Sequence, residues 1–299
     1  AYRALIAESW REIGEYILRH AELAESLAAK DPKDAARLLR IARNCRAIAT
    51  RAPERFEEGI QLFWFIWRLR STYTSCIGRM DVHLRELYER DVPAHTSREE
   101  ALDLLCELWE RLNDVYMGDT LMNVMLGGVD EAGNDVSNDL SLLIMEATMR
   151  VAKSEPHINV RIHPGSDPKF LETASRLIAK GQGQGVLYYD ENIIPALVAR
   201  GIPLEMARLY ANDGCTEITF DSHSAIWFWQ MESVKTLELA LFRGRENPST
   251  PFAPYHKWAH FQRPGVFHTK LTLGHDSGDF AKMTTFEEVY AAFLDQYGF

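Results

Sequence analysis

The tetrapeptide Gly214-Cys215-Thr216-Glu217 is the segment of this sequence whose residue types and spacing could do chemistry. A cysteine after a glycine, with a carboxylate two residues later, places a sulfur for nucleophilic or one-electron chemistry beside a group that can transfer a proton. Four residues alone also fit a buried structural cysteine. The surroundings of the loop must decide between these two interpretations.

Two other groups of residues lack the spacing that a cofactor or metal site needs. The glycine-rich run over residues 181–185 comes before a predicted strand, whereas a dinucleotide-binding loop follows a strand and opens a helix. The ten histidines form no H-E-x-x-H motif, and the four cysteines form no C-x-x-C pair. We therefore predict no metal site and no cofactor bound in this chain.

The bulk composition disfavours several classes of function. Of 299 residues, 46% are hydrophobic and 25% are charged, which fits a globular protein with a sizeable core. A nucleic-acid partner would require basic clusters, but the net charge is −10. The longest apolar run, residues 62–67, is too short to span a membrane. Unpaired cysteines fit the reducing cytoplasm, so we expect a cytoplasmic protein with neither a nucleic-acid nor a membrane partner.

The first half of the chain is predicted to be helical. Apolar residues recur at helical spacing on both sides of Asp31-Pro32, which predicts a helical hairpin over residues 3–50. A strongly apolar helix over 54–70 and a loop over 71–78 are expected next. The capping box Ser97-Arg98-Glu99-Glu100 stands before a row of leucines and gives the strongest helix signal in the sequence.

The second half is predicted to alternate strands and helices. Residues 158–163 and 186–189 have the pattern of strands, with a helix after each. A further helix is expected to end near Tyr210, before a loop over 211–219 that contains the Gly214-Cys215 pair. This order is typical of an α/β fold with parallel strands.

The loop around Cys215 resembles the glycine-cysteine-x-glutamate loop of glycyl radical enzymes, in the branch of dehydratases, C–N and C–S lyases and decarboxylases. Five further stretches resemble this family in the same order. They are Leu62-Phe63-Trp64-Phe65-Ile66-Trp67, Gly78-Arg79-Met80-Asp81, residues 123–130, Asn159-Val160-Arg161-Ile162-His163 and residues 189–197. The likeness covers most of the chain, from about Phe56 to Glu238.

The resemblance implies a ten-stranded α/β barrel surrounded by helices, with the cysteine on a loop through its centre. In this family a glycyl radical takes a hydrogen atom from the cysteine thiol, and the thiyl radical then takes one from a substrate carbon. On this sequence the thiyl residue is Cys215, and Glu217 assists proton transfer. A barrel interior suits this chemistry, because a carboxyl group in a water-poor cavity can donate as well as accept a proton.

Differences from the family bear on the substrate. Where polyol dehydratases have a carboxylate that holds substrate hydroxyls, this chain has the apolar and aromatic segment 226–230, and position 121 lacks the usual aromatic residue. The polar loop before Gly78 lies where related enzymes place a substrate-binding hydroxyl. We expect the substrate to contact some of five residues: Thr74, Cys76, Leu121, Trp227 and Trp229.

One part of the family pattern has no counterpart in these residues. The R-V-x-G-Y-like stretch that carries the glycyl radical is absent. We therefore expect residues 1–299 to be a single partial domain, the central portion of a larger pyruvate formate-lyase-type domain. The glycyl radical would come from a missing C-terminal part or from another chain. The resemblance also implies a radical-SAM activating enzyme as partner, and a homodimer is left open.

The expected function is thiyl-radical hydrogen abstraction from a small-molecule substrate, followed by elimination of a neighbouring group, as in a dehydratase-like C–O, C–N or C–S lyase. Two alternatives stay open. Trp227, Phe228 and Trp229 suit a radical decarboxylase of aryl acetates. A non-catalytic helical scaffold with a structural Cys215 would need no chemistry at all.

The barrel hypothesis makes a structural prediction. Residues 159–163 and 186–189 should be strands that face a common cavity containing Cys215. Because side chains alternate along a strand, Asn159, Arg161 and His163 should share one face, where they can contact the substrate or the cysteine loop.

Overall fold

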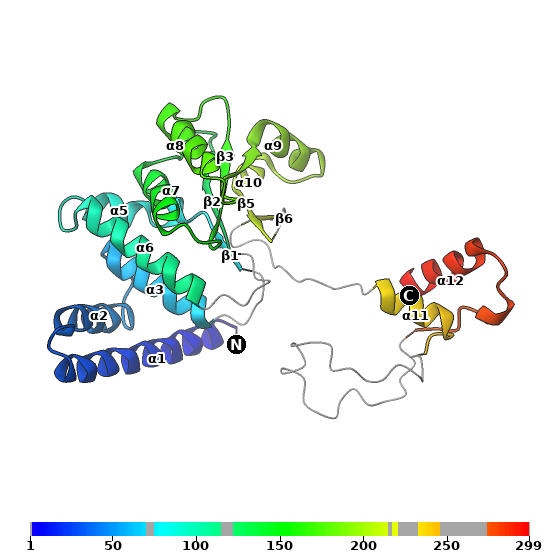
Figure 1. Cartoon of the computed structure of the whole chain (residues 1–299), viewed down its shortest axis with the longest axis horizontal. Coiled ribbons are helices and arrows are strands. Elements are labelled where there is room, and N and C mark those ends of the chain that lie inside the picture. Colours follow the sequence, from blue (N-terminus) through cyan, green and yellow to red (C-terminus); the bar gives the residue numbers. More distant parts are fainter. Residues whose placement is uncertain are drawn as a thin grey trace. The chain divides into compact units, whose positions relative to one another are not determined.

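The chain forms two compact units, residues 1–225 and residues 226–299 (Figure 1). The computed structural model describes residues 2–69, 75–114, 122–214, 217–220, 233–245 and 274–298. Within these ranges, no helix is both long enough and apolar enough to cross a membrane.

The first unit begins with the expected helical hairpin. Helices α1 (Tyr2–Lys30) and α2 (Ala35–Ile48) pack along each other on either side of the predicted break. Small side chains are buried between them and allow a close approach: Ala21, Ala24, Ala42 and Cys45. Helix α3 (Phe56–Leu69) joins this pair to the main core, because Phe65 packs with the hairpin while Phe56 packs with the sheet and its helices.

A four-stranded parallel sheet, in the order β1-β2-β3-β4, forms the centre of this unit. Its strands are β1 (Ser75–Gly78), β2 (Met122–Gly127), β3 (His157–Ile162) and β4 (Val186–Tyr189). Helices connect each strand to the next: α4 (Met80–His83), α5 (Arg85–Asp91), α6 (Arg98–Asp114), α7 (Asp139–Val151) and α8 (Pro168–Ala179). The capping box is confirmed, since Ser97 Oγ accepts the Glu100 amide at 3.2 Å and Glu100 Oε2 accepts the Ser97 amide at 2.8 Å.

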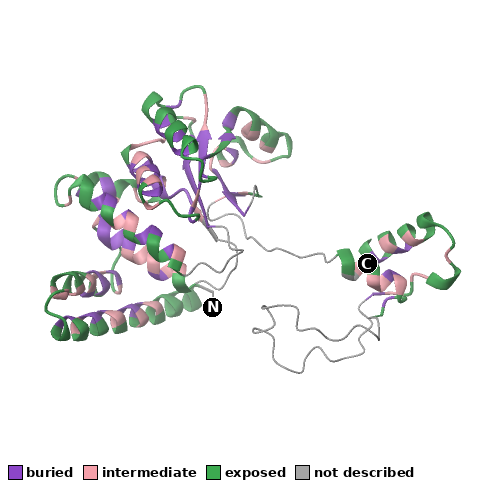
Figure 2. Ribbon diagram, viewed as in Figure 1, coloured by how far each residue is buried: buried purple, intermediate pink, exposed green. Residues whose placement is uncertain are grey.

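The two faces of the sheet have different neighbours. One face carries Val124, Leu126, Ile158 and Val160, which are buried in the main core with α6, α7 and α8 (Figure 2). After α9 (Asp190–Ala199) and α10 (Leu204–Ala207), the chain forms an antiparallel hairpin of β5 (Tyr210–Asp213) and β6 (Glu217–Phe220). Strand β5 lies against β1 and β2. The second face of the sheet therefore holds the hairpin.

The structure confirms some predicted elements and corrects others. Strands β3 and β4 lie where the sequence pattern placed them, and they pair in parallel. The expected loop over 71–78 is wrong in its second part, because β1 forms there, and β2 was not predicted at all. Strand β2 is buried along its whole length, so its sequence lacks the alternation that identifies a half-exposed strand.

The region of the cysteine loop also differs from its prediction. Tyr210 begins a strand instead of ending a helix, and residues 211–219 belong mostly to the β5–β6 hairpin instead of an irregular loop. The two strands are four residues each, and their pairing depends on contacts with the sheet that no local pattern shows. The helix-rich α/β class is confirmed, whereas the ten-stranded barrel stays a prediction.

The second unit contains two packed helices, α11 (Ser233–Leu241) and α12 (Phe286–Gly298), with a 3₁₀ helix at Phe280–Lys282 before α12. Arg243 Nε donates to Asp276 Oδ1 at 3.0 Å, and this bonding to the guanidinium lowers the pKa of Asp276 to about 2. The pair joins the segments that follow α11 and precede α12.

Candidate functional site

The β5–β6 hairpin carries the predicted catalytic loop. Strand β5 ends at Asp213 and β6 begins at Glu217, and these two residues are paired across the hairpin. Cys215 itself lies outside the described residues. So do four of the predicted substrate contacts: Thr74, Leu121, Trp227 and Trp229. Of Cys76 the structure describes only the backbone, which is part of β1 and pairs with Asn123 of β2. The roles of these residues therefore stay predictions.

Gly214 is suited to the turn between the two strands. Its φ of +57° is a conformation that glycine adopts more easily than other residues. A Cβ atom at this position would lie 2.6 Å from Glu217 Oε2, so the carboxylate folds back against the Gly214 backbone. Among the described residues the Glu217 side chain is exposed, and the water-poor cavity expected around it stays a prediction.

Two buried asparagines connect the sheet to the turn. Asn123 Nδ2 of β2 donates to the carbonyl oxygen of Gly214 at 2.5 Å. Asn123 Oδ1 in turn accepts from Asn159 Nδ2 of β3 at 3.0 Å. Each asparagine is only 1% exposed. The residue directly before Cys215 is therefore bonded to the face of the sheet.

Arg161 of β3 holds the other end of strand β5. Its side chain is completely buried and forms two parallel hydrogen bonds to Asp190, at 2.9 and 2.8 Å. The same guanidinium donates to the carbonyl oxygens of Tyr210 and Arg208, each at 2.9 Å. It also lies 3.8 Å from the centre of the Tyr210 ring. A cation over an aromatic face is an attractive contact, so ring and backbone of Tyr210 are fixed together.

Tyr210 and Gly128 complete this buried cluster. The Tyr210 hydroxyl donates to Asp190 Oδ1 at 2.7 Å, and burial raises the pKa of the hydroxyl far above its usual value. Gly128 has a φ of +80°, and a Cβ atom there would lie 2.3 Å from Arg161 Nε. The glycine thus leaves room for the guanidinium. Strand β5 is held at both ends, by Arg161 at Tyr210 and by Asn123 at Gly214.

Comparisons with known proteins agree with this arrangement. The family model described as "Pyruvate formate lyase-like" matches residues 1–299. The chain belongs to this family of glycyl radical enzymes.

Individual relatives of the family show how much of such an enzyme the chain represents. Trans-4-hydroxy-L-proline dehydratase of Clostridioides difficile is 29% identical over 93% of this chain and 36% of the relative. Isethionate sulfite-lyase of Desulfovibrio desulfuricans is 28% identical over 93% of the chain and 34% of the relative. The glycerol-bound B12-independent glycerol dehydratase from Clostridium butyricum superposes with a TM-score of 0.68 at 27% identity, over 96% of the chain and 36% of the structure. The chain thus spans about a third of its relatives' length.

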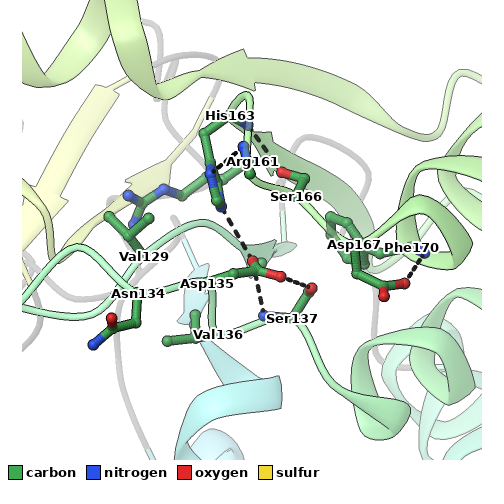
Figure 3. Close-up of polar contacts among 12 residues, drawn as sticks. Val129, Asn134, Asp135, Val136, Ser137, Arg161, His163, Ser166, Asp167 and Phe170 are labelled. Atoms are coloured by element: carbon green, nitrogen blue, oxygen red, sulfur yellow. Dashed lines mark hydrogen bonds and ion pairs between the residues drawn. The ribbon is translucent and has the colours of Figure 1, made fainter.

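Of the three residues predicted to share one face of this strand, Arg161 bonds to the β5–β6 hairpin, Asn159 connects to it through Asn123, and His163 contacts neither. Asn159 and Arg161 lie on the hairpin face, as expected. His163 follows the end of β3 and turns toward a different loop, where its Nε2 lies 3.1 Å from Asp135 Oδ1 (Figure 3). Its Nδ1 accepts the Gly165 amide at 3.2 Å, so Nε2 carries the proton that is donated to Asp135. Both ring nitrogens serve to shape the loop that follows β3.

Cys45 and Cys106, the two cysteines whose side chains the structure describes, are poor candidates for chemistry. Burial raises the pKa of the Cys45 thiol to about 11. Burial also raises the pKa of Cys106. A thiol with a raised pKa stays protonated at neutral pH and is a weak nucleophile. Neither thiol is therefore suited to act as a nucleophile.

Several residues of the site were not identified from the sequence. Asn123, Asp190 and Tyr210 had no predicted role, although the first two belong to stretches that resemble the family. A usable signal existed at Asn123, which is a lone polar residue in the buried segment Met122–Gly127. Buried polar groups need hydrogen-bond partners, so such a residue in a core strand indicates a specific contact.

The Arg161–Asp190 pair should contribute strongly to stability. Arg161→Met would leave the Asp190 carboxylate buried without its cation, and we expect the free energy of unfolding to fall by about 3–5 kcal/mol. Arg161→Met/Asp190→Leu removes both charges and should recover much of this loss. Urea unfolding followed by tryptophan fluorescence measures both variants. Arg243→Met, which breaks an exposed pair with Asp276, is the matched control and should change stability little. An equally mild effect of Arg161→Met would contradict the anchoring role.

Proposed function

We propose that this chain is the thiyl-bearing portion of a glycyl radical lyase, in which Cys215 abstracts hydrogen and Glu217 transfers a proton. The observation that carries the proposal is the β5–β6 hairpin. Its turn contains the Gly-Cys-x-Glu sequence, and its backbone is bonded to a parallel sheet by Asn123 and Arg161. Family membership and relatives that are dehydratases and sulfite-lyases support the same reaction class.

The chain's own residues fit a turn that must present a reactive thiol. Gly214 lacks a side chain and has a positive φ, so the strands can reverse direction next to Cys215. We assign the glycyl radical to another part of the assembly. Its role would be to remove the hydrogen atom from the Cys215 thiol. A radical-SAM activating enzyme is the partner that we propose for installing it.

The proposed reaction has three steps at this chain. The Cys215 sulfur takes a hydrogen atom from a substrate carbon, which leaves a carbon radical and a restored thiol. The bond from the adjacent carbon to the leaving group is then weak, and Glu217 transfers the proton that accompanies departure. The Cys215 thiol finally returns its hydrogen atom to the product radical.

We further propose that the four parallel strands are part of a ten-stranded barrel and that the enzyme works in the cytoplasm without oxygen. The observation that supports the barrel is the β5–β6 hairpin on the face of the sheet opposite α6, α7 and α8. In such a barrel the exposed Glu217 carboxylate would become enclosed by other parts of the enzyme. The decarboxylase alternative is not favoured, because the dehydratases and the C–S lyase described above match at least 93% of the chain, whereas the glycyl radical subunit of a 4-hydroxyphenylacetate decarboxylase of Clostridioides difficile matches 67% of it at 26% identity.

The function is tested by turnover of the full-length protein after anaerobic activation. The substrate panel consists of glycerol, trans-4-hydroxy-L-proline, isethionate and 4-hydroxyphenylacetate. We expect loss of water, or of sulfite, from a member of the first three, detected by mass spectrometry of the products. Release of carbon dioxide from 4-hydroxyphenylacetate alone would favour the decarboxylase. A protein that carries the activated radical and converts none of the panel or of related diols, hydroxy acids and amines would contradict the lyase proposal.

A further inference from the structure

The carbonyl group of Gly214 is the part of the turn that the sheet binds directly. We propose that Asn123 and Asn159 are positioning residues for the reaction: by holding this carbonyl oxygen they restrict the peptide group through which the turn continues to Cys215. The inference rests on the proposed function, in which the Cys215 sulfur must reach a substrate carbon.

The first step of the argument is covalent geometry. The carbonyl of Gly214 and the nitrogen of Cys215 belong to one peptide group, which is planar. A hydrogen bond that fixes the carbonyl oxygen therefore also restricts the nitrogen and Cα of Cys215. Asn123 Nδ2 makes this bond from a strand of the sheet, so the sheet is the reference frame for the thiol-bearing residue.

The second step is the orientation of the Asn123 amide. A carbonyl oxygen only accepts hydrogen bonds, so the NH₂ group of Asn123 must face Gly214. Its Oδ1 then needs a donor, and Asn159 Nδ2 supplies one at 3.0 Å. Asn159 Nδ2 also lies 3.4 Å from the carbonyl oxygen of His157. This second acceptor favours the orientation of Asn159 in which its NH₂ group, and not its oxygen, faces Asn123. The two amides thus orient each other.

The third step is burial. Both asparagines are 1% exposed, so water cannot replace a lost partner without entering the core. A buried donor or acceptor left without a partner costs about 1–3 kcal/mol. Rotation of the Asn123 amide by half a turn would break both bonds at once. The arrangement therefore has one stable orientation.

The fourth step is the sheet register. Asn123 pairs with His157 and Met125 pairs with Asn159, so the asparagines are diagonal neighbours on adjacent strands. Diagonal positions on one face of a sheet are within reach of long side chains. At the far end of β5, Arg161 holds Tyr210 from the next position on the same face of β3. Strand β3 thereby supports both ends of β5.

These contacts should matter for rate more than for substrate binding. Hydrogen transfer requires the donor and acceptor atoms to be in contact, and misplacement by about 1 Å can cost on the order of 100-fold in rate. The Asn123 amide is bonded to the loop backbone, and the Asn159 amide is bonded to Asn123. Loss of the Gly214 bond should therefore lower kcat and leave KM nearly unchanged.

The experiment uses the full-length protein with Asn123→Ala, Asn123→Ser and Asn159→Ala. Asn44→Ala is the matched control, because Asn44 is also buried but belongs to α2 and packs in the helical hairpin region. The first readout is hydrogen–deuterium exchange of the peptide that spans β5 and β6, in protein that has not been activated. We expect faster exchange in both Asn123 variants, a smaller effect in Asn159→Ala, and wild-type exchange in the control.

The second readout is turnover after activation. We expect kcat to fall by about 10- to 100-fold in the Asn123 variants, with glycyl radical content by EPR equal to that of the wild type. The isotope effect for a substrate deuterated at the abstracted position should increase, because a slower abstraction step limits the rate more. In the Asn123→Ala background, Asn159→Ala should have little further effect, since the connection to Gly214 is already lost.

Each outcome bears on the proposal in a defined way. Wild-type exchange at the hairpin together with a wild-type kcat in Asn123→Ser would overturn it. A fall in kcat with an unchanged isotope effect and an equal fall in Asn44→Ala would indicate a general loss of structure and would also overturn it. If the wild type converts no substrate, the proposed function fails, while the exchange experiment still decides whether the asparagines fix the hairpin. Asn159→Ala leaves the Gly214 bond in place and decides the case if both Asn123 variants fail to fold.

Discussion

Cys215→Ser in the full-length, activated protein should abolish turnover completely. A serine O–H bond is too strong for a glycyl radical to break, so the variant cannot form the hydrogen-abstracting radical. The glycyl radical should still form, because in the proposed mechanism the activating enzyme installs it on another part of the assembly. The side chains are similar in volume, and we therefore expect the fold to persist. EPR spin counting and product analysis measure the two effects separately.

The control for this variant is Cys106→Ser. Cys106 lies on α6, is half-buried and has a thiol whose pKa is raised by burial. It should retain turnover and radical content. An activated Cys215→Ser enzyme that still converts substrate would end the thiyl hypothesis.

Glu217→Gln should lower kcat by about 10²- to 10⁴-fold, the usual contribution of general acid–base catalysis. Glutamine preserves the shape of the side chain and removes the ionisable group. The hairpin should remain intact, because Glu217 pairs with Asp213 through the backbone.

Glu172→Gln provides the comparison, since Glu172 is an exposed carboxylate on α8. It should behave as the wild type. A Glu217→Gln enzyme at full rate would remove the proton-transfer role and leave the radical step in place. Because the carboxylate lies against Gly214, Gly214→Ala should also impair turnover by displacing it, whereas the same change at Gly201, where a Cβ meets nothing within 4 Å, displaces no group.

Local features of the sequence were sufficient for most helices. The capping box at Ser97 needs only residues within one turn, and its reciprocal bonds are present in the structure. The hairpin of α1 and α2 follows from apolar spacing and the break between them. Strands β3 and β4 were also predicted, β3 from its alternation of apolar and polar residues and β4 as a short run after the glycine-rich segment. These signals are local, so no tertiary information was needed.

Strands β1, β2, β5 and β6 depended on the tertiary structure. Strand β2 is buried along its length and β5 is four residues long, so neither has a period that identifies it. Their hydrogen bonds connect segments far apart in the chain. A parallel strand exists only when its neighbour is in place, and the sequence pattern of one strand contains no information about that neighbour.

The same division holds for the candidate site. The sequence by itself determined the family likeness, the Gly-Cys-x-Glu loop and the assignment of Cys215 and Glu217 as candidates. Only the tertiary structure decided that Asn123 meets Gly214 across 91 residues of chain and that Arg161 meets Tyr210 across 49. The physical reason is register: a shift of β2 or β3 by one residue would turn Asn123 or Arg161 into the helix-facing core. Pairing between distant strands sets that register. It places Asn123 and Arg161 on the face of the sheet that contacts the β5–β6 hairpin.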